Sequence, residues 1–364
     1  MVKKYKETMS HKERVLKTFN LEKTDRVTIG YEANPGIHMG LSKALGISDG
    51  NKELVLQALG VDYRGVSAPY IGLMLFKTLP GRRTDPVDGY NMRWVEHASG
   101  GYWDFCDFPL ANADDETIEN FPVPNPDHFD YEAVEQQLSL YKDYAIYVGG
   151  AGVPDVINST ARIMGMEDTL VNLAIEHEPT INFINKRMNM RLDVLERTLD
   201  KYRGRIDFMW LGEDLGTQHR PLISPEMYRK VLKPIHKRFV DLAKTYNIPV
   251  IIHSCGSSSW AYEEFIEMGI KGVDSIQPEA ANMSPKYLKE RFGSRLCFRG
   301  CISTGGALAF GTIEDVKKEV KNTLEIMMDG YGYHFAPAHA IQDNTPVENV
   351  IAMYQSVYDY GFYR

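Results

Sequence analysis

Eight short apolar runs, separated by longer amphipathic stretches, constrain the fold more than any other feature of this sequence. Most of the runs are almost continuously apolar, as expected for strands that are covered on both faces. Strands of this kind alternating with helices predict an α/β protein, a (β/α)8 TIM barrel. The alternative, an open doubly wound sheet, lacks its usual G-x-G-x-x-G cue after a strand. The runs lie at residues 27–32, 62–68, 145–150, 207–212, 249–254, 273–278, 296–301 and 333–338.

The stretches between the runs carry helix signals. Residues 224–247 open with Ser-Pro-Glu and continue with apolar residues at helical spacing. Residues 167–202 are long enough for two helices, with a break expected near Pro179. Thr312, followed by Asp315 three residues later, predicts a capped helix start.

One segment interrupts this alternation. Residues 89–110 contain two aromatic-rich stretches around Ser99-Gly100-Gly101, which predicts a β-hairpin inserted at the rim of the barrel, where it could act as a lid. The whole chain, residues 1–364, is interpreted as one barrel domain whose first 26 residues form an N-terminal helical arm.

Composition excludes several classes of protein. The chain has 364 residues, 43% of them hydrophobic, a net charge of −8 and no Lys/Arg-rich run, so it predicts a globular protein that binds neither nucleic acid nor an anionic membrane. It has no stretch of about 18 apolar residues and no apolar core of a signal peptide. Four cysteines are too few for a disulfide scaffold. We therefore expect a cytoplasmic protein with reduced thiols.

Polar and metal-ligating residues gather where the predicted strands end, which is where TIM barrels carry their chemistry. Around these ends we predict a set of side chains that contact a small-molecule substrate, although aromatic residues and a surface arginine at such places are often structural. The predicted substrate-binding residues are Tyr31, Asn34, Arg162, Gln277 and Gln342.

His253 and Cys255 end the fifth run and are the strongest metal signal. Residues at i and i+2 of a strand share a face, so an imidazole and a thiol can aim at one point, as zinc requires. A third ligand is needed, and His339, Cys301 and Glu213 are candidates at other strand ends. The alternative is a buried polar histidine beside an incidental cysteine, and packing is the simpler interpretation of Cys301.

Glu213 and Asp214 are adjacent carboxylates at the end of the fourth run. Near a cation they would stay ionised and could serve as catalytic acid/base or ligand. The structural alternative is a turn followed by a charged helix start.

The order of motifs in the second half resembles the uroporphyrinogen decarboxylase superfamily. The motifs are GEDLGTQ, SPEMYRKVLKP, IIHSCG, GVDSIQPE, FGSRLCFRGCIST and GYHFAPAHAIQDNTP. The resemblance extends over nearly the whole chain and is strongest from about residue 207 onward. It implies a (β/α)8 barrel, which agrees with the strand pattern.

The superfamily contains decarboxylases and zinc-dependent corrinoid methyltransferases, and the sequence resembles the second branch more closely. The decarboxylases carry an Arg-rich R-Q-A-G-R-Y segment after the first strand, whereas this chain has YEANPGIHMG at residues 31–40, without an arginine. The methyltransferases have H-x-C after the fifth strand, matched by His253 and Cys255, and a distant cysteine after the last strand, where this chain has His339. Because the metal-free decarboxylases also have a histidine there, His339 remains ambiguous, with Cys301 as the alternative third ligand.

The resemblance implies a zinc-dependent methyltransferase. It would move a methyl group between a methylated corrinoid (methylcobalamin, possibly on a partner protein) or a small methylated substrate and an acceptor such as a thiol or tetrahydrofolate. The alternatives are a metal-free carboxy-lyase acting on a smaller acid, and a non-catalytic scaffold subunit of a methyltransferase complex.

Overall fold

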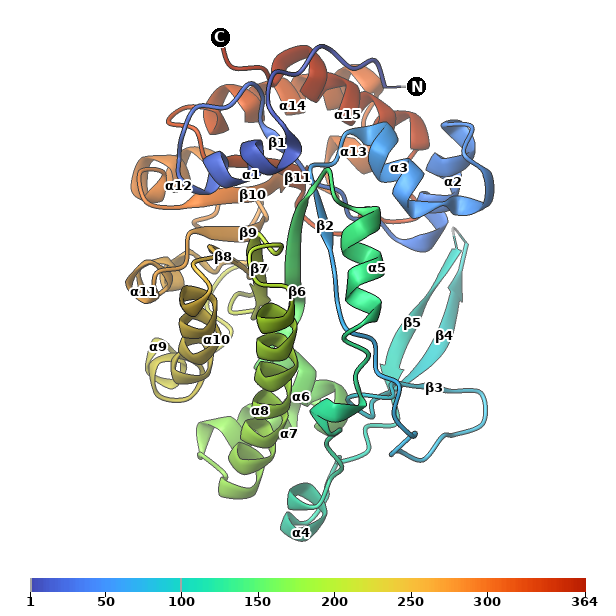
Figure 1. Cartoon of the computed structure of the whole chain (residues 1–364), viewed down its shortest axis with the longest axis vertical. Helices are drawn as coiled ribbons and strands as arrows, with labels where there is room; N and C mark the ends of the chain where they lie inside the picture. The colour runs from blue at the N-terminus through green and yellow to red at the C-terminus, as the bar shows by residue number, and fades with distance from the viewer. Residues whose placement is uncertain (1, 99) are drawn as a thin grey trace.

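The computed structural model of the chain describes residues 2–98 and 100–364, so Met1 of the predicted arm and Ser99 of the predicted hairpin lie outside the described residues. Its main sheet has eight parallel strands in the order β1-β11-β10-β9-β8-β7-β6-β2 (Figure 1). Each strand overlaps one of the eight apolar runs, which confirms the α/β class. The strands are β1 Thr28–Ile29, β2 Tyr63–Gly65, β6 Ala145–Pro154, β7 Phe208–Gly212, β8 Val250–His253, β9 Gly272–Ile276, β10 Cys297–Ile302 and β11 Tyr333–Pro337.

The sheet curls as in a TIM-barrel-like fold, and its first and last strands meet through one residue. The backbone N–H of Asp62 donates to the carbonyl of Ile29 at 3.0 Å. The Asp62 carboxylate in turn accepts from the Ile29 N–H at 2.7 Å and from the guanidinium groups of Arg14 and Arg26. Burial alone would raise the pKa of Asp62, but Arg26, His11 and Arg14 hold this pKa well below its usual range.

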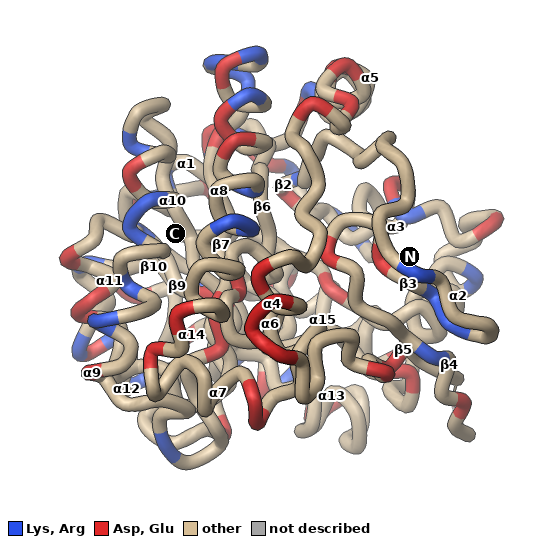
Figure 2. Tube along the Cα trace, turned by 90° about the horizontal axis from the view of Figure 1, so that it is seen from below, with Lys and Arg blue, Asp and Glu red and all other residues tan. Residues whose placement is uncertain are grey.

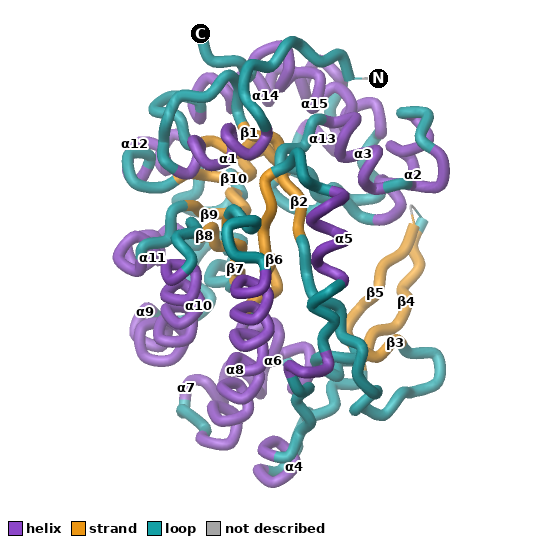
Figure 3. Tube along the Cα trace, in the orientation of Figure 1, coloured by secondary structure: helices purple, strands orange, loops and turns teal. Residues whose placement is uncertain are grey.

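Helices cover the outer face of the sheet, and both termini lie at the same end of the molecule (Figures 1 and 3). The helix predicted over 224–247 begins with α9 and continues through a π-helical turn, Tyr228–Leu232, into α10. The break near Pro179 is confirmed because α7 ends at Ala174 and α8 begins at Glu178. The α-helices are α1 His11–Phe19, α2 Pro35–Ala44, α3 Lys52–Leu59, α4 Asp115–Glu119, α5 Ala133–Leu140, α6 Val156–Met164, α7 Met166–Ala174, α8 Glu178–Lys201, α9 Pro225–Met227, α10 Lys233–Thr245, α11 Tyr262–Met268, α12 Pro285–Phe292, α13 Ala307–Phe310, α14 Ile313–Met327 and α15 Val347–Tyr360.

A second, antiparallel sheet stands to one side of the barrel (Figure 1). It consists of β3 Arg83–Thr84, β4 Asn91–His97 and β5 Gly100–Cys106. Trp94 lies opposite Trp103 in the β4–β5 ladder, and their rings meet edge to face. β4 and β5 lie within residues 89–110, where a hairpin was predicted, whereas β3 precedes this segment. The role of the hairpin as a rim or lid remains a prediction.

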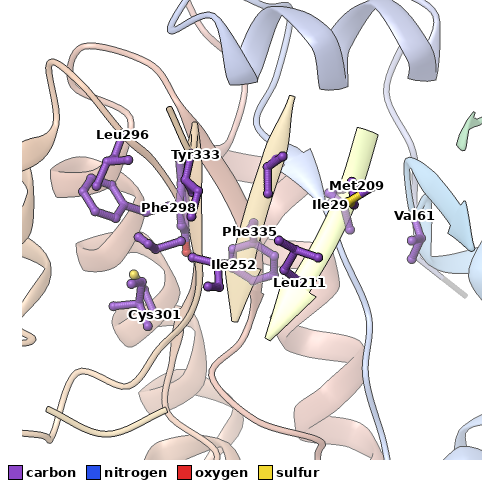
Figure 4. Close-up of a cluster of buried hydrophobic side chains, with 14 of the residues drawn as sticks. Ile29, Val61, Met209, Leu211, Ile252, Leu296, Phe298, Cys301, Tyr333 and Phe335 are labelled. Atoms are coloured by element: carbon purple, nitrogen blue, oxygen red, sulfur yellow. The ribbon is translucent and has the colours of Figure 1, made fainter. Parts of the chain in front are cut away.

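The barrel has two main layers of hydrophobic core, and a third, smaller cluster packs Leu110 against Ile163 and Phe183. The larger layer lies between the sheet and the outer helices, and Figure 4 shows part of it around Phe298, Cys301 and Phe335. The smaller layer fills the barrel interior, where Phe19 of α1 contacts Phe208, with ring centroids 5.2 Å apart. The barrel is therefore packed beneath its functional end, as in other barrels of this class.

Two sequence expectations concern the surface. No helix among the described residues is long and apolar enough to cross a membrane. Acidic and basic residues are mixed along the trace in Figure 2.

Candidate functional site

Three side chains from two neighbouring strands converge where these strands end. β7 and β8 are parallel and pair Gly212 with His253, so the residues that follow β7 lie beside the end of β8. Among the described residues, one potential metal-ligand atom from each of Asp214, His253 and Cys255 lies within 4.8 Å of the others. The predicted ligand pair His253 and Cys255 therefore has a third potential ligand, the carboxylate of Asp214.

Contacts within this triad point the donor atoms inward. The His253 Nε2 atom lies 3.2 Å from Cys255 Sγ and 3.5 Å from Asp214 Oδ1. The backbone N–H of Cys255 donates to Asp214 Oδ1 at 2.9 Å, and Asn158 donates to Asp214 Oδ2 at 2.9 Å. The Asp214 side chain is still 31% exposed, which leaves an open side for a substrate.

Asp274 orients the imidazole from behind. Its Oδ2 atom lies 3.0 Å from His253 Nδ1, while its Oδ1 atom accepts from the guanidinium of Arg299. A carboxylate at Nδ1 favours the tautomer with the proton on that nitrogen and leaves Nε2 as the lone-pair donor. Metal-binding histidines in proteins are usually supported in this way.

The side chains of the triad hold protons that a bound metal ion would displace. Burial alone would lower the pKa of His253, but Cys255 and the carboxylates of Asp214 and Asp274 raise this pKa well above its usual value. Burial likewise opposes ionisation of Asp214, yet His253 and the Cys255 N–H hold the pKa of Asp214 below its usual range. Burial raises the pKa of the Cys255 thiol. Without a metal the site therefore keeps a second proton on the His253 imidazole and a proton on the Cys255 thiol, and a bound cation would displace both.

The donor set fits zinc. Zinc takes imidazole nitrogen, thiolate sulfur and carboxylate oxygen, and its catalytic sites combine three protein ligands with an open position. Calcium and magnesium prefer sites made of oxygen ligands, which this triad does not provide. Asp214, His253 and Cys255 could therefore hold zinc, with Asp274 as the supporting carboxylate.

The carboxylate of Glu213 makes its contacts outside the triad. Its fully buried carboxylate accepts from the backbone N–H groups of Val156 at 2.7 Å and Ile157 at 2.9 Å, at the start of α6. The Nε2 atom of His236, on α10, lies 3.0 Å away. Both oxygens are engaged, so Glu213 holds α6 against the barrel, and the contacts give no support to its predicted catalytic role.

Asp155 and Arg162 form an ion pair beside the triad. Arg162 Nη2 lies 3.3 Å from Asp155 Oδ2, and Asn158 donates to both Asp155 and Asp214. Burial, followed by the charge of Glu213, raises the pKa of Asp155 to about 7. Arg162 is thus partnered by a protein carboxylate, and substrate binding by it stays a prediction.

Two other candidates for the third ligand, His339 and Cys301, also lie outside the triad. His339 is exposed, with Nδ1 3.4 Å from the Gln342 amide. Cys301 is buried in the outer hydrophobic layer with Phe298 (Figure 4). The physical reason is a bulge where β9 pairs with β10. Between the pairs Val273–Phe298 and Ile276–Gly300, β9 has one more residue than β10, and the φ angles of Gly300 and Cys301 in β10 are +117° and +73°. Such a bulge changes the face to which the following side chain points.

The remaining predicted substrate residues line different parts of the barrel mouth. Tyr31 lines a cavity of about 630 Å³. Asn34 donates to Gln342 at 3.3 Å, and Gln277 donates to Gln218 at 3.1 Å. None of these contacts tests their predicted role in binding a substrate.

Sequence reasoning missed Asp274, Arg299 and Asn158. Asp274 and Arg299 are charged residues inside otherwise apolar strands, and they are 1% and 2% exposed. A buried charge requires a partner, so these two positions carried a signal that could have been read from the sequence. Asn158 lies on α6 and carried no comparable signal.

Comparisons with known proteins support the resemblance. Residues 214–360 match the family model described as uroporphyrinogen decarboxylase (URO-D). Among solved structures, a methyltransferase from Methanosarcina mazei is similar, with a TM-score of 0.65 and 18% sequence identity, covering 97% of this chain and 99% of that one. At this identity the similarity establishes a shared fold. No curated protein matches the chain.

Proposed function

We propose that this protein is a zinc-dependent methyltransferase of a corrinoid system. Asp214, His253 and Cys255 would hold the metal, and the observation that carries the proposal is the convergence of their donor atoms within 4.8 Å. The methyltransferase from Methanosarcina mazei with the same fold and the match to the uroporphyrinogen decarboxylase family support it. Asp214 replaces His339 and Cys301 as the proposed third ligand.

Zinc at this site would supply Lewis acidity that favours the thiolate form of an acceptor thiol. The residues of the chain would do the rest: Asp274 keeps the Nδ1 proton on His253, and Asn158 holds the second Asp214 oxygen. The exposed side of Asp214 leaves room for the acceptor. The methyl group would come from a methylated corrinoid, possibly on a partner protein, or from a small methylated substrate.

Metal content tests the proposal. Protein purified without added metal should contain about one zinc per chain, a stoichiometry that follows from one three-ligand site. Cys255→Ala should lose it. Cys106→Ala is a matched control, because Cys106 is a buried thiol on β5. Wild type without zinc after reconstitution, or Cys255→Ala with full zinc, would refute the metal site. Methyl transfer from methylcobalamin to a thiol then tests the reaction.

The carboxy-lyase remains the second candidate, and the match to the uroporphyrinogen decarboxylase family favours it. Asp155, with its pKa raised to about 7, lies beside Arg162 and could exchange a proton near neutral pH. This candidate predicts that small carboxylic acids lose CO₂ in the presence of a chelator, at a rate that Cys255→Ala leaves unchanged.

A further inference from the structure

Arg299 lies between a cavity of about 630 Å³ and the proposed metal site. The cavity is lined by residues of β2, β6, β7 and β10, among them Arg299, by residues of α2 and α3, and by the segment between β1 and α2. Arg299 connects the two places, because its Nη1 group donates to Asp274, which supports His253. A molecule in the cavity would thus touch the same arginine that supports the metal ligand.

Arg299 has donor capacity left for a ligand. Its Nε group donates to Tyr63 Oη at 2.7 Å and its Nη1 group to Asp274. Within the described residues its Nη2 group has an ion-pair contact, with Glu32 Oε2 at 3.8 Å, which is too long for a hydrogen bond. A buried guanidinium whose Nη2 group has no close acceptor is suited to hydrogen-bond an oxygen of a carboxylate.

Glu32 is a weak partner for Arg299. Its side chain is 46% exposed, whereas that of Arg299 is 3% exposed. Exposed carboxylates at such distances contribute little binding energy and compete poorly with a well-placed anion. Asp274 also serves two partners, Arg299 and His253, so one carboxylate faces two cationic groups.

Aromatic side chains surround Arg299 on one wall of the cavity, while charged residues, among them Lys52, Glu53 and Arg64, line another part. Trp210 stacks under the Arg299 guanidinium, with 4.6 Å between the guanidinium carbon and the ring centroid. Tyr147 and Tyr63 flank Trp210, with ring centroids 5.1 and 6.1 Å from it. Tyr31 completes the lining near the mouth. Rings in this arrangement offer edges and faces to a flat apolar body.

We propose that this cavity is the substrate pocket and that it binds a planar aromatic carboxylate. The carboxylate would take the Nη2 side of Arg299 and displace Glu32, and the ring would pack against Tyr147 and Trp210. This inference deepens the proposed function, since it names the chemical class of the small substrate. The two proposals can be tested separately, because binding of a carboxylate to the cavity is measured without methyl transfer.

Isothermal titration of the full chain as purified tests the pocket, with benzoate, benzamide and acetate as probes. Benzoate should bind at least about 10-fold more tightly than benzamide, which has the same shape without the charge, because a charged hydrogen bond contributes about 1.5–3 kcal/mol. Acetate, which lacks the ring, should bind more weakly than benzoate. Equal affinity of benzoate and benzamide, or of benzoate and acetate, would overturn the proposal.

Two variants locate the binding site. Arg299→Lys should weaken benzoate binding, because lysine cannot present the planar fork. Glu32→Gln, at an exposed position that tolerates the change, should strengthen binding by removing the competing carboxylate. Unchanged affinity in Glu32→Gln would refute the displacement of Glu32, even if Arg299→Lys failed to fold.

The Cys255→Ala variant tests whether benzoate binding in the cavity depends on the metal. It should bind benzoate as well as wild type does, although it is expected to lack zinc. Loss of benzoate binding in Cys255→Ala would show that the carboxylate sits on the metal and would overturn the role of Arg299. Benzoate binding by a protein without zinc would uphold the pocket while the proposed methyltransferase failed.

Discussion

Replacing Asp274 with asparagine should weaken metal binding from outside the ligand triad. Asp274 accepts from His253 Nδ1 at 3.0 Å with one oxygen and from Arg299 with the other. Asparagine has one acceptor oxygen and one donor amide, so it can satisfy only one of them. If its oxygen stays on Arg299, its amide faces Nδ1 and forces the imidazole proton onto Nε2, where it blocks the metal.

The expected loss is about 10–100-fold in zinc affinity, the usual effect of removing a supporting carboxylate, or about 1.4–2.7 kcal/mol. A competition titration with a chromophoric chelator measures this directly. Asp88→Asn is the matched control, because Asp88 is a carboxylate with a side chain only 12% exposed and is held by two arginines, Arg187 and Arg191. Both variants should lose stability, but only Asp274→Asn should lose zinc affinity. Equal zinc affinity in Asp274→Asn and wild type would refute the argument.

Three further predictions use other residues. Asp214→Ala should lower zinc content, whereas His339→Ala and Cys301→Ala should keep it; metal analysis of the purified variants decides which is the third ligand. Glu213→Ala should cost about 1–3 kcal/mol of unfolding free energy in urea, because two buried N–H groups lose their acceptor, while zinc content stays unchanged. Arginines hold the folded-state pKa of Asp62 below its unfolded value of about 3.9, so its stabilisation is present above about pH 4 and lost as the pH falls. Urea unfolding between about pH 3 and 7 should show a shallower acid loss in Asp62→Asn, and an unchanged slope would contradict this.

Most of the fold could be predicted because strand burial leaves a direct mark on sequence. Each of the eight parallel strands overlaps an apolar run, since a strand covered on both faces needs apolar side chains on both. The capped start of α14 at Thr312 and Asp315 was equally visible, because a capping box depends on two side chains three residues apart. The closure of the sheet through Asp62 was not predicted, since its partners Arg14 and Arg26 lie far from it in sequence.

The site was predicted only where its geometry is local. The shared direction of His253 and Cys255 follows from strand alternation, so two ligands could be found without a structure. The sequence does not distinguish the roles of the neighbouring carboxylates Glu213 and Asp214. Only their contacts in the folded structure do so. Glu213 meets the start of α6 and His236, and Asp214 meets His253.

Cys301 shows how a single bulge can defeat the same alternation argument. In a regular strand Cys297, Arg299 and Cys301 would share one face, and Cys301 would point into the barrel beside Arg299. The shift at Gly300 turns Cys301 into the outer core and leaves Arg299 as the last inward side chain of β10. If the conformation of Gly300 determines where Cys301 and Arg299 point, Gly300→Ala should disturb the position of Arg299. A Cβ atom at residue 300 would lie 2.6 Å from the backbone nitrogen of Ile276. Benzoate binding should then weaken together with folding stability, whereas intact benzoate affinity in Gly300→Ala would show that Arg299 is positioned independently of the bulge.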